Sequence, residues 1–341
     1  MLENIIGRVW LLAPIIISSL FLSLGLVVLL RPLLARHALA HPNSRSSHQA
    51  PTPQGGGIAV ISAAILVSWC AVALQPVVVA DQALQLVALT AAMILLAVVG
   101  AIDDVRSLGA TPRLVMQCIA VGTIIAVLPS DSHILPHLPW WLERTCLFVG
   151  GLWFVNLVNF MDGIDWMTVA EFVPTAGTIA LLGFAGEIRL LPALLAASLL
   201  GAVLGFAPFN KPVAKLFLGD VGSLPMGLLL GWLLLKLAEN GHLIAALILP
   251  LYYLADASIT LLWRIVRRER VWLAHRSHFY QRAIDRGFTV LEIVSRVFFV
   301  NLALAALALA TFAAPDLNWF LVIVAAAIVA VLLVSLVRAQ R

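Results

Sequence analysis

Residues 10–30 read WLLAPIIISSLFLSLGLVVLL, an apolar run that contains no charged side chain. A transmembrane helix needs about 20 such residues to cross a hydrocarbon core about 30 Å thick. Comparable runs occupy residues 57–80 and 319–337. Because the first run is too long for the core of a signal peptide and lacks a basic segment before it, we predict that it is retained as a helix.

The composition of the whole chain also indicates a membrane protein. Of its 341 residues, 62% are hydrophobic and only 11% are charged, and the mean hydropathy is +1.04. Soluble globular domains carry about 25% charged residues. The cysteines Cys70, Cys118 and Cys146 lie in apolar stretches at unrelated spacings, which indicates neither a disulfide framework nor a zinc site. We therefore predict an all-α polytopic membrane protein that forms a single domain over residues 1–341.

The distribution of basic residues predicts the orientation in the membrane. One set of alternating loops and helix edges carries 17 of the 21 lysine and arginine residues, whereas Arg8, Arg144, Arg189 and Lys236 fall on the other side. The positive-inside rule makes the richer side cytoplasmic, so the N-terminus is predicted outside and the C-terminus inside. Eleven transmembrane helices are expected, over residues 10–30, 57–79, 84–102, 114–128, 144–158, 168–185, 189–207, 222–238, 243–263, 293–313 and 318–337.

Five polar clusters interrupt this apolar chain, and the predicted topology places all of them on the cytoplasmic side. The fullest is NLVNFMDGIDWM, residues 156–167. Acidic residues at bilayer edges are costly, so several clusters that face one way suggest a site. The clusters supply Arg45 and His48 before the second helix, Asp103, Asp104 and Arg113 after the third, Asn159, Asp162 and Asp165 after the fifth, Asn210, Lys215, Phe217 and Asp220 before the eighth, and His275, Arg276 and His278 after the ninth.

Each cluster also has a structural explanation when it is taken alone. The Asp103–Asp104 pair could cap a helix end, Asp220 could be the N-cap of the next helix, and residues 264–287 could rest as a basic loop on anionic lipid head groups. The coincidence of five clusters on one face favours a site instead. Carboxylate and amide oxygens suit a hard cation, Mg²⁺ or Mn²⁺, and nearby arginine and histidine suit phosphate groups.

The motifs of these clusters resemble those of a known enzyme family. DD after a helix, NxxNxxDGxD, FNxPxAKxFxGDxGS and a late loop with histidines are similar, in order and position, to those of the polyprenyl-phosphate N-acetylhexosamine-1-phosphate transferases. This glycosyltransferase 4 group contains MraY and WecA. PNSRSSHQAPTPQGGGIA, residues 42–59, resembles the WecA branch, and the whole chain most resembles the WbpL-type initiators of lipopolysaccharide O-antigen.

The resemblance implies a reaction and a role for each motif residue. The reaction transfers N-acetylhexosamine-1-phosphate from a UDP-sugar to undecaprenyl phosphate in the bacterial inner membrane and releases UMP. Asn159 and Asp220 would hold Mg²⁺, while Asp103 and Asp104 would lie near the attacking lipid phosphate, with Asp220 also counted as catalytic. Substrate binding would fall to Arg45, His48, Arg113, Asp162, Asp165, Asn210, Lys215, Phe217, His275, Arg276 and His278, with Phe217 stacked on the uracil.

Two departures from the family pattern leave the sugar open. The late loop reads HRSH where MraY and WecA have adjacent histidines, and Trp166 stands where MraY has a small residue. A phospho-muramoyl-pentapeptide transferase is the alternative within the fold. A secondary transporter or flippase for an anionic lipid-linked substrate is the alternative from another class, although such proteins place their charges near the midplane on broken helices. Membrane lipids are expected partners and nucleic acid is not, and homodimerisation is left open.

Overall fold

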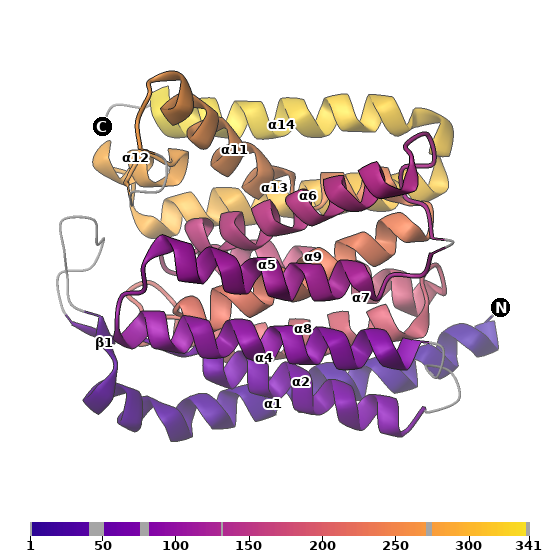
Figure 1. The fold of residues 1–341 in the computed structure, drawn as a ribbon, viewed down its shortest axis with the longest axis horizontal. Helices are drawn as coiled ribbons and strands as arrows, with labels where there is room; N and C mark the ends of the chain where they lie inside the picture. Colours follow the sequence, from indigo (N-terminus) through magenta and orange to yellow (C-terminus); the bar gives the residue numbers. More distant parts are fainter. Residues whose placement is uncertain (1, 41–50, 76–81, 131, 271–274, 339–341) are drawn as a thin grey trace.

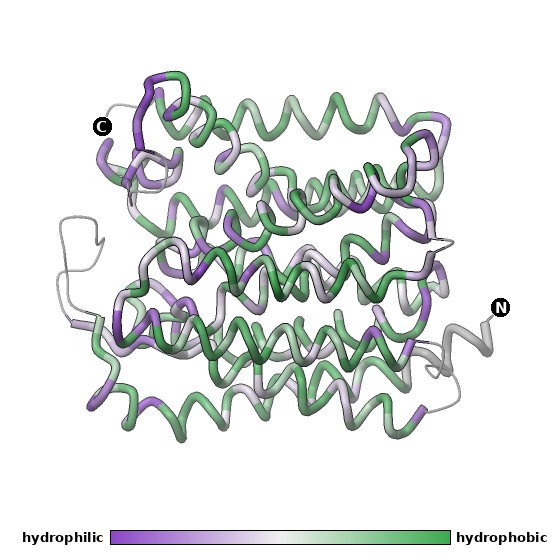
Figure 2. The backbone as a smooth tube through the Cα atoms, in the orientation of Figure 1, coloured by the Kyte–Doolittle hydropathy of each residue, from purple (hydrophilic) through white to green (hydrophobic). Residues whose placement is uncertain are grey.

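The computed structural model describes residues 2–40, 51–75, 82–130, 132–270 and 275–338 of the chain. Its helices lie side by side along one direction (Figure 1), and α1 begins at the end of the bundle opposite to the end where α14 stops. Hydrophobic residues fill the middle of the helices and hydrophilic residues gather near their ends (Figure 2). This is the distribution expected of a bundle that a bilayer surrounds.

The described residues form long helices and one small hairpin. Seven helices are long and apolar enough to cross a membrane, and α2, α5 and α8 are shorter apolar helices. The protein is therefore a multi-pass membrane protein. The elements are α1 (Leu2–His37), β1 (Leu39–Ala40), β2 (Thr52–Pro53), α2 (Gly57–Ala73), α4 (Ala83–Val105), α5 (Ala110–Ala126), α6 (Trp140–Met161), α7 (Met167–Ala185), α8 (Leu190–Phe206), α9 (Asp220–Glu239), α10 (Leu243–Ile248), α11 (Leu251–Val266), α12 (Phe279–Asp285), α13 (Val290–Ala313), η2 (Pro315–Leu317) and α14 (Asn318–Arg338).

The predicted helix ranges agree with these elements except in one place. Each of the other ten ranges overlaps one helix, although several ends differ and residues 76–81 lie outside the described part of the chain. The range 243–263 is wrong as a single helix, because α10 ends at Ile248 and α11 begins at Leu251. Pro250 lies at the break, where its missing N–H cannot continue the helical hydrogen bonds. The number of membrane crossings and their orientation stay predictions.

Small residues bring three helices together at one end of the bundle, which we call the polar end. It is the end that carries β1 and α12 in Figure 1. A Cβ atom on Gly57 of α2 would overlap the backbone of Gly222 in α9, and one on Gly100 of α4 would overlap the backbone of Asp220. Small residues allow membrane helices to approach this closely. The close approach fixes where α4 and α9 meet.

The β-hairpin closes over the same end. The N–H groups of Gly56 and Gly57 donate to the carbonyls of Phe217 and Leu218 at 2.8 Å each. The glycines 55–57 thus tie the start of α2 to the segment that leads into α9.

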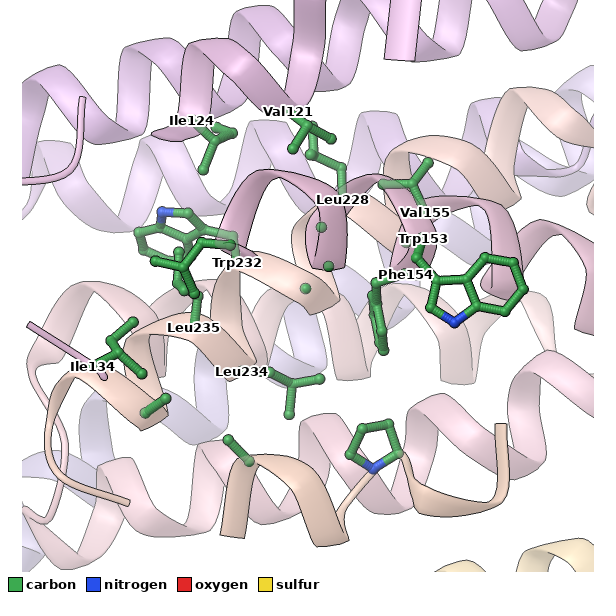
Figure 3. A pocket seen from close by; sticks show the side chains of 18 of the residues that line it. Val121, Ile124, Ile134, Trp153, Phe154, Val155, Leu228, Trp232, Leu234 and Leu235 are labelled. Carbon is green, nitrogen blue, oxygen red and sulfur yellow. The ribbon is translucent and has the colours of Figure 1, made fainter. Parts of the chain in front are cut away.

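A separate apolar cavity of about 290 Å³ lies between α5, α6, α9 and α10. Figure 3 shows the apolar side chains that line it, among them Ile124, Phe154 and Leu234. None of the described residues that line the cavity is charged.

Candidate active site

Four predicted site residues contact one another at the polar end, and we call them the central cluster: Asp103, Arg113, Asn159 and Asp220. Arg113 Nη1 lies 2.9 Å from Asp103 Oδ2 and 3.5 Å from Asp220 Oδ2. Asn159 Nδ2 donates to Asp220 Oδ1 at 2.8 Å and to Ser223 Oγ at 2.9 Å. The cluster therefore joins the end of α4, the start of α5, the end of α6 and the start of α9.

The neighbouring carboxylate, Asp104, has a different environment. Its Oδ1 accepts from the backbone N–H of Asp220 at 2.9 Å and its Oδ2 from that of Val221 at 3.1 Å. Gln54 Nε2 also donates to Oδ1. Backbone N–H groups at a helix start lack partners within the helix, and a carboxylate there is also favoured by the helix dipole. Asp104 therefore caps α9 from a different helix, and both of its oxygens are occupied.

The turn after α6 places a fourth carboxylate, that of Asp162, near the central cluster. Thr168 Oγ1 donates to Asp162 Oδ1. Burial raises the pKa of the Asp162 carboxyl to about 8, and the charges of Asp220, Asp104 and Asp165 act in the same direction. A group of carboxylates that repel one another in this way favours the binding of a cation.

Two other residues predicted to bind substrate, Asp165 and Asn210, make hydrogen bonds that join neighbouring segments of the chain. The buried Asp165 accepts from the N–H of Ala214 at 2.9 Å through Oδ2. The buried Asn210 accepts from the N–H of Trp166 at 2.8 Å and donates to the carbonyl of Leu216 at 3.1 Å. Trp166 has a positive φ of 60°, which is uncommon for a bulky residue. Asp165 and Asn210 thus join the turn after α6 to the loop before α9, and their role toward substrate stays a prediction.

The late loop lies against the turn after α6. Tyr280 Oη donates to the carbonyl of Phe160 at 3.0 Å, and a Cβ on Gly163 would overlap that hydroxyl. The ring centroids of His278 and Phe160 are 6.4 Å apart. The DG pair of the NxxNxxDGxD motif therefore has a physical reason, because only glycine leaves room for Tyr280.

One buried carboxylate that the sequence analysis missed organises this loop. Asp256 of α11 lies 3.1 Å from His278 Nδ1 through its Oδ1, and it accepts from the backbone N–H groups of Phe279 and Tyr280. It therefore caps α12 and orients the His278 ring. Its sequence signal was an aspartate inside the apolar run YYLADASIT, residues 252–260, and such residues in membrane helices are usually functional.

The remaining predicted residues are more scattered. His275 stacks on His278 with a centroid separation of 5.0 Å, and Arg276 pairs with Asp285 at 3.2 Å. The Lys215 side chain is exposed and Phe217 is half-buried beside the hairpin. Arg45 and His48 lie outside the described residues.

The donor atoms of the central cluster suit a hard divalent cation. Asp103 and Asp220 supply carboxylate oxygens that already converge on one cationic side chain, Arg113. Asn159 can add its amide oxygen. Within the described part of the chain, no group of three or more His, Cys, Asp or Glu side chains forms a ready ligand set. Mg²⁺ usually binds through one or two carboxylates together with substrate phosphates, so the residues fit a cation that arrives with a phosphorylated substrate.

Acidic, amide and basic side chains at one end of a bundle of membrane helices suit the binding of phosphate groups and a divalent cation at a membrane. Comparison with known proteins shows that residues 86–238 match the model of glycosyl transferase family 4. Together with the relatives below, this match supports the group of MraY and WecA.

Three relatives illustrate the group. A probable undecaprenyl-phosphate N-acetylglucosaminyl 1-phosphate transferase of Bacillus subtilis is 24% identical, over 80% of this chain and 78% of the relative. A decaprenyl-phosphate N-acetylglucosaminephosphotransferase of Mycolicibacterium smegmatis is 29% identical, over 57% of this chain and 52% of the relative. A phospho-N-acetylmuramoyl-pentapeptide-transferase of Bartonella quintana is also 29% identical, over 56% and 57%. The last two matches span just over half of each relative.

Proposed function

We propose that this protein transfers an N-acetylhexosamine-1-phosphate from a UDP-sugar to undecaprenyl phosphate at the cytoplasmic face of a bacterial inner membrane and releases UMP. One observation carries the proposal. Asp103, Arg113, Asn159 and Asp220, from four separate helix ends, meet within hydrogen-bond or ion-pair distance. With Mg²⁺ held beside Arg113, this arrangement would offer the positive charge needed to bind a diphosphate and a lipid phosphate together. The names of the relatives support the same reaction.

In the proposed reaction an oxygen of the lipid phosphate attacks the β-phosphorus of the UDP-sugar. The new P–O bond forms as the bond from the β-phosphorus to the bridging oxygen breaks, and its electron pair leaves with UMP. A phosphate monoester has a second pKa of about 6, so the nucleophile is already mostly dianionic at neutral pH. Phosphoryl transfer then needs mainly positioning and charge stabilisation.

We assign a separate role to each residue of the central cluster and to the two histidines beside it. Asp103 holds the Arg113 guanidinium at 2.9 Å, so its role is to orient a phosphate-binding group more than to remove a proton. Asp220 and Asn159 would hold Mg²⁺, which when bound neutralises charge on the phosphate oxygens. His278, fixed by Asp256, and its neighbour His275 would contact the sugar diphosphate.

The apolar cavity supports a hydrocarbon substrate. Its lining is formed by residues such as Val121, Leu228 and Leu234, whose hydrocarbon side chains suit a prenyl chain. Two of the helices that line the cavity, α6 and α9, also carry residues of the central cluster. A prenyl chain in the cavity would therefore belong to the same helix bundle as the proposed phosphate site. Initiation of lipopolysaccharide O-antigen synthesis is the pathway that we propose for the product.

The first test is UMP release by the purified full-length protein in detergent. Undecaprenyl phosphate, Mg²⁺ and a panel of UDP-N-acetyl sugars would be supplied, with UDP-muramoyl-pentapeptide as the competing donor. Release should require the lipid, should stop with EDTA and resume with excess Mg²⁺, and should be absent in Asp220→Ala. If folded protein released no UMP from any donor, the transferase proposal would be wrong, and the transporter alternative would be the function to test next.

A further inference from the structure

A second polar pocket lies beside the late loop, outside the central cluster. Its volume is about 210 Å³, and α11, α12 and residues of the segment between them form its walls. The residues that line it include Trp263, Arg264, Arg267, Glu269, Ser277 and Arg282. We propose that this pocket binds the phosphate group of a membrane lipid.

The charges of the pocket do not cancel. The buried Arg264 is paired with Glu269, its Nε lying 2.9 Å from Glu269 Oε2. Arg267 and Arg282 have no carboxylate partner among the described residues. Both guanidinium groups lie over the same indole ring, that of Trp263, at 4.8 Å and 5.9 Å from its centroid. Two guanidinium groups that line one pocket without a carboxylate partner in the described part of the chain favour the binding of an anion there.

The position of the pocket indicates a lipid as the source of the anion. Thr260, Trp263 and Arg267 follow Asp256 along α11 at helical spacing, so they share one face of the helix. Trp263 is 54% exposed near the end of α11, and tryptophan is enriched where membrane helices meet the head groups. Basic pockets between membrane helices on the cytoplasmic side commonly bind lipid head groups.

The pocket also adjoins the loop that holds the histidines. Ser277 and Phe279 line it, whereas His278 between them pairs with Asp256. Ser277 Oγ lies 2.7 Å from His275 Nδ1. A head group bound here would therefore contact the segment that positions both histidines. The binding itself does not depend on the proposed transferase reaction and can be measured separately.

The test is native mass spectrometry of the full-length protein in a non-ionic detergent, titrated with phosphatidylglycerol or with phosphatidylcholine. The wild type should bind phosphatidylglycerol more tightly than phosphatidylcholine. Each arginine near an anionic head group contributes about fivefold in affinity, so Arg267→Gln with Arg282→Gln should weaken binding roughly 25-fold. Arg282→Lys, which keeps the charge, should retain most of the affinity.

A matched control separates the pocket from general surface charge. Arg268→Gln with Arg270→Gln removes the same charge from the same basic segment, but neither side chain lines the pocket. It should leave the preference for phosphatidylglycerol largely intact. An equal loss in both double variants, each with an unchanged unfolding temperature, would overturn the proposal. Binding of inorganic phosphate as tight as that of phosphatidylglycerol would show that a soluble phosphate, and not a lipid, is the ligand.

Discussion

The two adjacent aspartates at the end of α4 should behave oppositely when each loses its charge. Asp104 accepts from two backbone N–H groups at the start of α9 and from Gln54. Asp104→Asn places an NH₂ group against at least one of these donors. Loss of one charge-assisted hydrogen bond, together with the interaction with the helix dipole, costs about 3 kcal/mol.

Asp103 is the matched control for this substitution. Its Oδ1 accepts from the N–H of Leu108 at 2.6 Å, a bond that the oxygen of an asparagine can keep. Asp103→Asn should therefore leave stability nearly unchanged while it releases Arg113 and lowers UMP formation. Asp104→Asn should lower the unfolding temperature by roughly 5 °C or more.

The assay is thermal unfolding in detergent, followed by tryptophan fluorescence, with UMP release measured on the same samples. A wild-type unfolding temperature for Asp104→Asn would refute its assignment as the cap of α9. An equal fall in both variants would refute the division of roles between the two residues.

Three further substitutions have distinct expected results. Asp256→Asn should lower the rate of UMP release about tenfold, as loss of a residue that orients a ligand often does, and Asp256→Glu should restore part of it; unchanged rates in both would contradict the role of Asp256. Burial raises the pKa of Asp162 to about 8 from an ordinary value of 3.8. As pH rises from 3.8 to 8, Asp162 ionises in the unfolded chain but stays protonated in the folded protein, so the free energy of unfolding falls. Asp162→Asn should therefore raise the unfolding temperature, measured in EDTA, by an amount that grows from pH 4 to 8 and then levels off; a constant difference would count against the shift. Gly57→Ala should lower the unfolding temperature, because its Cβ would overlap Gly222, whereas Gly150→Ala, whose Cβ would meet nothing within 4 Å, should not.

The sequence predicted the helices well because a membrane span is defined by the length of an apolar run. The gathering of polar clusters at one end was also predictable, since alternation of loops fixes the side on which each lies. Hydropathy does not report hydrogen bonding, however. It therefore could not show that Asp104 caps α9 or that Asn210 accepts from the N–H of Trp166. The break at Pro250 was also missed, because one proline hardly changes the mean hydropathy of residues 243–263.

Asp256 shows a different kind of limit. It was visible as a charged residue in an apolar run, but no motif contained it. Only the folded chain shows that it faces His278, 22 positions further on. Pairings of this kind depend on how α12 lies across α11, and no local pattern in the sequence encodes that crossing.

The central cluster can be complete only late in the synthesis of the chain. Its residues span positions 103 to 220, and the histidine loop follows at 275–278. A nascent chain that has inserted its first five helices carries Asp103 and Asn159 but lacks Asp220, which joins them. Because the central cluster is the site of the proposed transfer, we expect the growing polypeptide to be inactive until α9 has been synthesised.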